Sequence, residues 1–113
     1  MTNEELNREL CRCGKTFFIE FFEIFNCVDW TSRKEVSSCK NLVFNVLKTK
    51  ATPSGQPYAA SGLNFRFPAI RKIWTAQQEK AALCNIVNSK ALPPDVRKKA
   101  IDLLIKYFGL CDE

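Results

Sequence analysis

Apolar side chains recur at every third or fourth position through the first quarter of the chain, which is the repeat of one helix face. This stripe consists of Leu6, Leu10, Cys13, Phe17, Phe21, Ile24 and Val28. Gly14 lies within the stripe without shifting its phase, so we predict one long helix with Gly14 as the place where it could kink. A second apolar line widens the arc and consists of Phe18, Phe22 and Phe25. Such a helix is buried on more than one side, by neighbouring helices or by a partner molecule.

The middle of the chain predicts a second helix followed by a long loop. Ser32 and Glu35 have capping-box spacing and open the helix, which must end before Pro53 because proline cannot donate a backbone hydrogen bond. From about 51 to 67 the helical period is absent, and Pro, Gly and Ser interrupt the chain, so we predict a central loop. Its second half, Leu63 to Phe67, alternates apolar and polar residues and could form a short extended segment.

Proline marks the start of two more predicted helices. A third helical face runs from 68 to 87, and Thr75 with Gln78 offers an alternative start within it. Pro93, Pro94 and Asp95 mark the start of a fourth helix, which ends at Gly109. The fold class is therefore all-α: a compact bundle of about four helices in a single domain that spans the whole chain. The expected core residues are Leu6, Leu10, Phe17, Phe21, Ile24, Val43, Leu47, Ile73, Leu103 and Leu104.

Composition agrees with a globular domain of 113 residues, because 46% of them are hydrophobic and 26% are charged. The longest apolar stretch, Phe17 to Val28, is interrupted by polar residues and is too short to span a membrane. The first residues are polar and acidic, unlike a secretory signal. We therefore expect an intracellular, cytoplasmic protein that does not enter a membrane.

Catalytic motifs are not recognisable. The chain has no His, which removes the commonest general base. Gly14, Lys15 and Thr16 imitate the end of a P-loop, but Glu9 stands where that motif requires Gly. Two carboxylates on one helix face, Glu20 and Glu23, lack the His partner of a di-metal site. We expect a non-catalytic protein without a cofactor; an enzyme that uses a thiol or paired carboxylates is the weakest hypothesis.

The cysteines are best explained as buried thiols, because a reducing cytosol does not favour disulfides. They stand at positions 11, 13, 27, 39, 84 and 111. Three disulfides would be the alternative for an exported protein. A zinc site is a sharper alternative, but its four ligands would lack the C-x2-C spacing of common zinc folds; they would be Cys11, Cys13, Cys27 and Cys39. We therefore predict no metal site.

Charge is distributed unevenly along the chain. Residues 1–29 carry three basic and six acidic side chains, whereas residues 30–72 carry eight basic side chains and one acidic side chain. Residues 73–113 carry six basic and five acidic side chains, so the three segments have net charges of −3, +7 and +1. A basic region of this kind is typical of proteins that bind a polyanion, and nucleic acid is the first candidate.

Basic and aromatic side chains interleave beside the predicted loop. We expect Arg66, Arg71 and Lys72 to hold phosphates, and Phe65 or Trp74 to stack on bases. A plainer explanation places the aromatic rings in the core and leaves the charged ends in water. A second basic cluster near the start of the last helix opposes the helix dipole, so stability alone does not explain it; it comprises Arg97, Lys98 and Lys99. The two clusters would form one patch if the fold brought them together.

The main rival hypothesis is a protein-interaction module, such as an inhibitor, adaptor or subunit. It would use the second apolar line of the first helix together with Phe44, which stands among polar residues on the second helix. The candidate interface residues are Phe18, Phe22, Phe25 and Phe44. In this hypothesis the basic region steers an acidic protein surface toward the interface, and a homodimer through the Phe face is a special case.

Overall fold

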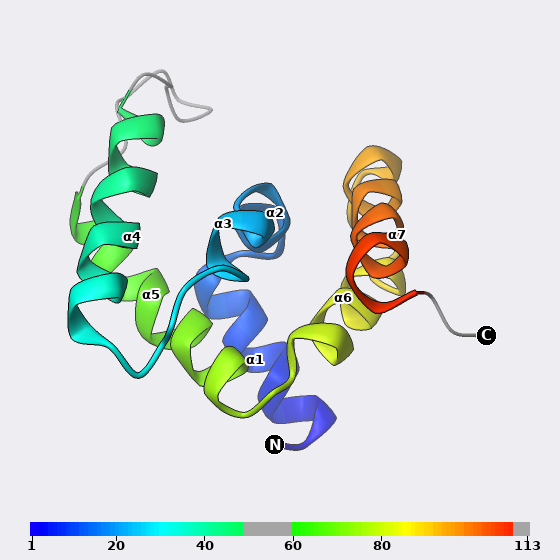
Figure 1. Cartoon of the computed structure of the whole chain (residues 1–113). Coiled ribbons are helices and arrows are strands. Elements are labelled where there is room, and N and C mark those ends of the chain that lie inside the picture. The colour runs from blue at the N-terminus through cyan, green and yellow to red at the C-terminus, as the bar shows by residue number, and fades with distance from the viewer. Residues whose placement is uncertain (49–59, 110–113) are drawn as a thin grey trace.

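The computed structural model describes residues 1–48 and 60–109, and these residues form an all-α fold (Figure 1). Within the two described ranges there is no strand. The helices are α1 (Asn3–Cys13), α2 (Lys15–Glu20), α3 (Phe22–Phe25), α4 (Arg33–Leu47), α5 (Ala60–Thr75), α6 (Glu79–Val87) and α7 (Pro94–Phe108). In the part of the chain that the structure describes, seven helices therefore stand in place of the predicted four or so, because the first and third predicted helices are each divided.

The predicted first helix is wrong as a single element, because it is divided at two places. Gly14 ends α1 with a φ of +88° and a ψ of 121°, a backbone conformation that favours glycine. A second interruption occurs at Phe21, whose φ of −110° and ψ of 13° separate α2 from α3. Apolar side chains on both sides of each break still point into the core, as the burial of Leu10, Phe17 and Phe25 shows.

The second half of the predicted loop is also wrong, because residues 60–67 belong to α5. Leu63, Phe67 and Ile70 are buried at steps of four and three, which is the spacing of a helical face. Residues 63–67 alone also alternate apolar and polar side chains, so this short segment does not distinguish a helix from a strand. Pro68 lies inside α5 instead of at its start, so the carbonyl of Asn64 lacks its usual helical donor. The first half of the predicted loop, 51–59, lies outside the described residues.

The other predicted boundaries agree better with the structure. The Ser32 hydroxyl accepts a hydrogen bond from the Glu35 backbone N–H at 3.3 Å, as a helix cap does. The predicted 68–87 helix divides near its alternative start, because Gln77 has a φ of 57° and α6 begins at Glu79. The last helix ends at Gly109 as predicted, and Gly109 adopts a left-handed conformation there.

Helices α4 and α5 lie on one side of the molecule and α7 on the other, with the short helices α2 and α3 between them (Figure 1). Helix α1 packs along α5, and α6 packs along α7. The predicted core is confirmed except at Ile24, which is half-buried. In the described ranges no helix is both long enough and apolar enough to cross a membrane.

Aromatic rings fill the centre of this core. Phe25 is fully buried, and its ring centroid lies 5.9 Å from that of Trp30 and 5.7 Å from that of Phe67. The two indole rings, Trp30 and Trp74, stack with centroids 5.9 Å apart. Because these rings come from α3, α5 and the segment between α3 and α4, their contacts hold the α4–α5 side of the molecule to the Phe-rich helices.

Candidate functional site

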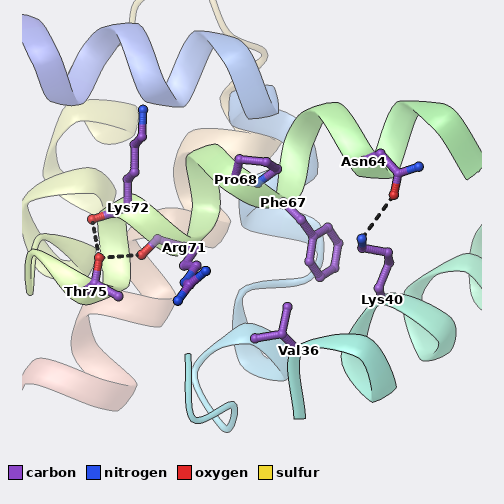
Figure 2. A pocket seen from close by; sticks show the side chains of 8 residues that line it. All are labelled: Val36, Lys40, Asn64, Phe67, Pro68, Arg71, Lys72 and Thr75. Carbon is purple, nitrogen blue, oxygen red and sulfur yellow. Dashed lines mark hydrogen bonds between the residues drawn. The ribbon is translucent and has the colours of Figure 1, made fainter. Parts of the chain in front are cut away.

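A groove of about 540 Å³ lies between α4 and α5. Figure 2 shows the side chains that line it, none of which is a carboxylate. They are Val36, Lys40, Asn64, Phe67, Pro68, Arg71, Lys72 and Thr75. The groove therefore combines apolar walls with cationic and neutral polar groups, which suits a negatively charged ligand.

Lys40 is held at the α4 side of this groove. Its Nζ atom donates a hydrogen bond to Oδ1 of Asn64 at 3.0 Å (Figure 2). The same ammonium group lies 5.7 Å from the centroid of the Phe67 ring, within the range of a cation–π interaction. Both contacts leave the positive charge uncompensated, because neither partner is an anion.

Arg71 presents an exposed guanidinium group to the groove (Figure 2). In the described part of the chain this side chain has no ion-pair or hydrogen-bond partner; its contact with Thr75 uses the backbone carbonyl, which accepts from the hydroxyl at 2.9 Å. A guanidinium has five N–H donors arranged to match phosphate oxygens. Arg71 is therefore the strongest candidate for a phosphate contact.

Two more cations continue along the same face of α4. By helical spacing, Arg33 and Lys48 share a face with Lys40, and both are exposed. Fifteen residues separate the outer two, so the face extends for about 22 Å. We call Arg33, Lys40, Lys48 and Arg71 the basic strip.

Lys72 is partly neutralised and is a weaker candidate. It points away from the groove toward α1 (Figure 2), where its Nζ atom lies 3.6 Å from Oε2 of Glu9. Glu9 also pairs with Arg12 at 3.3 Å. Because Glu9 is only 7% exposed, these two cations compensate a carboxylate that would otherwise be buried without a partner.

Arg66 was predicted to hold phosphates, but the structure gives it a structural contact instead. Its Nη1 atom donates a hydrogen bond to the backbone carbonyl of Cys13 at 2.6 Å. Its guanidinium carbon lies 4.8 Å from the centroid of the Phe17 ring. Arg66 thus satisfies a carbonyl at the end of α1, where helical donors are lacking, and it is half-buried.

The two predicted stacking residues have different environments. Trp74 is half-buried, its Nε1 donates to Oδ1 of Asn26 at 3.2 Å, and its ring packs on Phe18 and Phe22. The plainer explanation is therefore correct for Trp74, and its ring is not a free platform. Phe65 is 66% exposed and remains available for stacking.

The second predicted basic cluster is on the opposite side of the molecule from the groove. Arg97, Lys98 and Lys99 all belong to α7, which Figure 1 shows across α2 and α3 from α4 and α5. The fold does not join the two clusters into one patch. Arg97 is half-buried as well, whereas Lys98 and Lys99 are exposed.

The predicted Phe interface is not an exposed surface. Phe18, Phe22 and Phe25 are each 0% exposed, and aromatic residues of α5 and α7, together with Trp30, pack against their rings. Phe44 is half-buried and packs against the core. The wide apolar arc of the first segment is therefore covered by its own chain, and a partner that docks on these three rings would require the fold to open.

The carboxylates and thiols singled out by the sequence are not assembled into one centre. Glu23 accepts hydrogen bonds from Lys106 at 2.6 Å and from Tyr107 at 2.9 Å, and these contacts lower the pKa of Glu23. Among the described residues, no group of three or more His, Cys, Asp or Glu side chains is placed to hold a metal ion. The four-cysteine zinc alternative is therefore not formed.

The described thiols divide into two sets that should differ in reactivity. Burial raises the pKa of Cys13 to about 12 and that of Cys39 to about 11. Cys11, Cys27 and Cys84 are exposed, so at about pH 8 they should react with a disulfide reagent before the buried pair. A kinetic thiol titration of the native protein checks this order. One thiol far faster than the other exposed thiols would instead favour a cysteine enzyme.

The same two pKa values predict a loss of stability in alkali. Folding raises both from an ordinary value of 9.0, so the folded state opposes ionisation of Cys13 and Cys39. Their contribution to stability is complete below about pH 9 and is lost as the pH rises toward about 11 and 12.

Sequence reasoning missed the α4 half of the candidate site. Arg33, Lys40 and Lys48 recur at intervals of seven and eight residues, which places them on one face of a predicted helix. This spacing was a usable signal. What it could not show is that this face lies beside α5, so that Lys40 and Arg71 line the same groove.

Comparisons with known proteins add no relative to this description: no family model, no curated protein and no solved structure matches the chain.

Proposed function

We propose that this protein is a non-catalytic nucleic-acid-binding protein that holds phosphates with the basic strip of α4 and α5. The observation that carries the proposal is the pairing of Lys40 and Arg71 across a groove without a lining carboxylate. The proposal keeps Arg71 from the sequence prediction, adds three residues of α4, and removes Arg66 and the α7 cluster.

Elementary electrostatics favours this strip over the other basic side chains. Within the described ranges no carboxylate pairs with Arg71, so a phosphate that approaches it displaces counterions only, whereas Lys72 and Arg12 are already engaged by Glu9. The apolar ring of Phe67 beneath Lys40 lowers the local dielectric and strengthens attraction to an anion.

Arg71→Gln should weaken binding of a labelled oligonucleotide, because it removes one phosphate contact and leaves a shorter, neutral polar side chain. We expect the Kd to rise by roughly 3- to 10-fold at fixed salt, a loss of about 1 kcal/mol. Fluorescence anisotropy measures the Kd. Lys98→Gln is the matched control, since it makes the same change of charge on exposed α7 and should leave the Kd within about twofold.

A substitution at Glu9 should instead raise the affinity for nucleic acid. Glu9→Gln removes a negative charge beside the strip and frees Lys72, so it should tighten binding by roughly 2- to 5-fold. Equal affinities for wild-type, Arg71→Gln and Glu9→Gln proteins would contradict the proposal. Displacement of the oligonucleotide by polyglutamate at equal charge concentration would indicate that the true partner is an acidic protein surface.

A further inference from the structure

Phe65 is an exposed aromatic ring that packing in the core does not explain. It projects from α5 with 66% of its surface exposed, whereas every other described aromatic residue is buried or half-buried. With most of its surface exposed, Phe65 gains little from burial within its own chain. Its face is open to a flat apolar ligand.

Phe65 lies in a second hollow of about 500 Å³, between α1 and α5. This hollow and the groove beside α4 share three lining residues, Asn64, Pro68 and Lys72, so they lie on the two sides of one ridge of α5. A flexible chain that crosses the ridge at Pro68 would occupy both.

The two hollows differ in charge in a way that suits different parts of a nucleotide. In the α4 groove, the guanidinium group of Arg71 is exposed and has no ion-pair partner among the described residues, so it can contact a phosphate. In the second hollow, Arg12 and Lys72 both pair with Glu9, so the positive charge there is partly compensated. A partly compensated site that contains an exposed ring is better suited to an uncharged base than the groove of Lys40 and Arg71 is.

Resting on the proposed function, we infer that the protein binds single-stranded nucleic acid, with phosphates on the basic strip and an unpaired base stacked on Phe65. A base within a duplex is covered on both faces by its neighbours, so Phe65 could reach one only after unstacking it. A single strand presents free base faces and bends more readily over the ridge at Pro68.

The test compares a short oligothymidylate with a duplex of equal length, using wild-type protein, Phe65→Leu and Phe65→Tyr. Phe65→Leu keeps an apolar side chain but removes the aromatic face, and should weaken single-strand binding by roughly 5- to 100-fold. Phe65→Tyr keeps the face and should bind the single strand within about twofold of wild type. Because Phe65 is exposed, all three proteins should unfold at similar urea concentrations.

The outcomes separate this inference from the proposed function. Loss of single-strand affinity in Phe65→Leu, with duplex affinity and salt dependence unchanged, supports the inference. If Phe65→Leu binds the single strand like wild type while Arg71→Gln still weakens binding, the inference fails and the proposed function stands. If wild-type protein binds neither oligonucleotide, both fail.

Discussion

Phe25→Ala should lower the free energy of unfolding by about 3–5 kcal/mol, the range measured for deleting a buried Phe side chain. Phe25 is 0% exposed and contacts rings from α2, α5 and the segment before α4, including Phe17, Phe67 and Trp74. The cavity left by the deleted Phe25 ring cannot collapse easily, because the surrounding rings pack against one another. Domains of this size have about 5–15 kcal/mol of stability, so the variant should be partly unfolded in mild denaturant.

Urea unfolding followed by Trp fluorescence measures this loss, since Trp30 and Trp74 lie within the same cluster. Phe65→Ala is the matched control: it deletes an identical side chain from an exposed helix position and should change stability by less than about 0.5 kcal/mol. If Phe25→Ala were as stable as the control, the ring would not be buried and the rival Phe interface would be restored.

Gly14→Ala should also be strongly destabilising, by about 2–4 kcal/mol, although it adds a single methyl group. The φ of +88° at Gly14 is strained for any residue with a side chain. A Cβ atom there would lie 2.7 Å from Nη1 of Arg66, so the guanidinium would have to leave the Cys13 carbonyl that it caps.

Gly62→Ala is the control for this change, because it lies in a helix and a Cβ there meets nothing within 4 Å. Alanine is the better helix former, so this variant should be as stable as wild type or more stable by up to about 1 kcal/mol. Melting temperatures of the two variants, measured side by side, give the comparison. Similar melting temperatures for both variants would show that the fold does not depend on the positive φ at Gly14.

These two sites show what the sequence could and could not predict. Five residues of the stripe, from Leu6 to Phe21, are buried as the helical period predicts, whereas Ile24 and Val28 are only half-buried. It indicated Gly14 only as a place where one long helix could kink, and it gave no sign of the break at Phe21, since a break that preserves the phase of the stripe leaves no mark on the pattern. Likewise, Pro68 suits the first turn of a helix and predicts a start there, yet the helix extends N-terminal to it and buries Leu63 and Phe67.

The candidate site was predicted only in part, because contacts between residues far apart in the sequence decide which cations are available. Arg66 and Arg71 look equivalent in the sequence, but five residues along a helix place them on different faces. Arg66 meets the Cys13 carbonyl, 53 residues away, while Arg71 faces the α4 groove. Similarly, the contact between Glu9 and Lys72 joins segments of opposite net charge. Such pairings depend on tertiary packing, which residue spacing does not contain.

The arrangement links the aromatic core to the proposed function. Phe67 belongs to the core through its contacts with Phe25 and Trp30, and it also lies beneath Lys40 in the groove. The buried rings therefore fix the position of α5 and, with it, the distance between the cations of α4 and Arg71. The proposed site lies on two packed helices, so we expect it to be formed before a ligand binds.

The most direct test of this account is the salt dependence of single-strand binding by the wild-type protein, measured from about 50 to about 200 mM salt. If three or four residues of the basic strip each contact a phosphate, a plot of the logarithm of the association constant against that of the salt concentration should have a slope of about −2 to −3. A slope near zero would contradict the account, because binding would then not release counterions from phosphates.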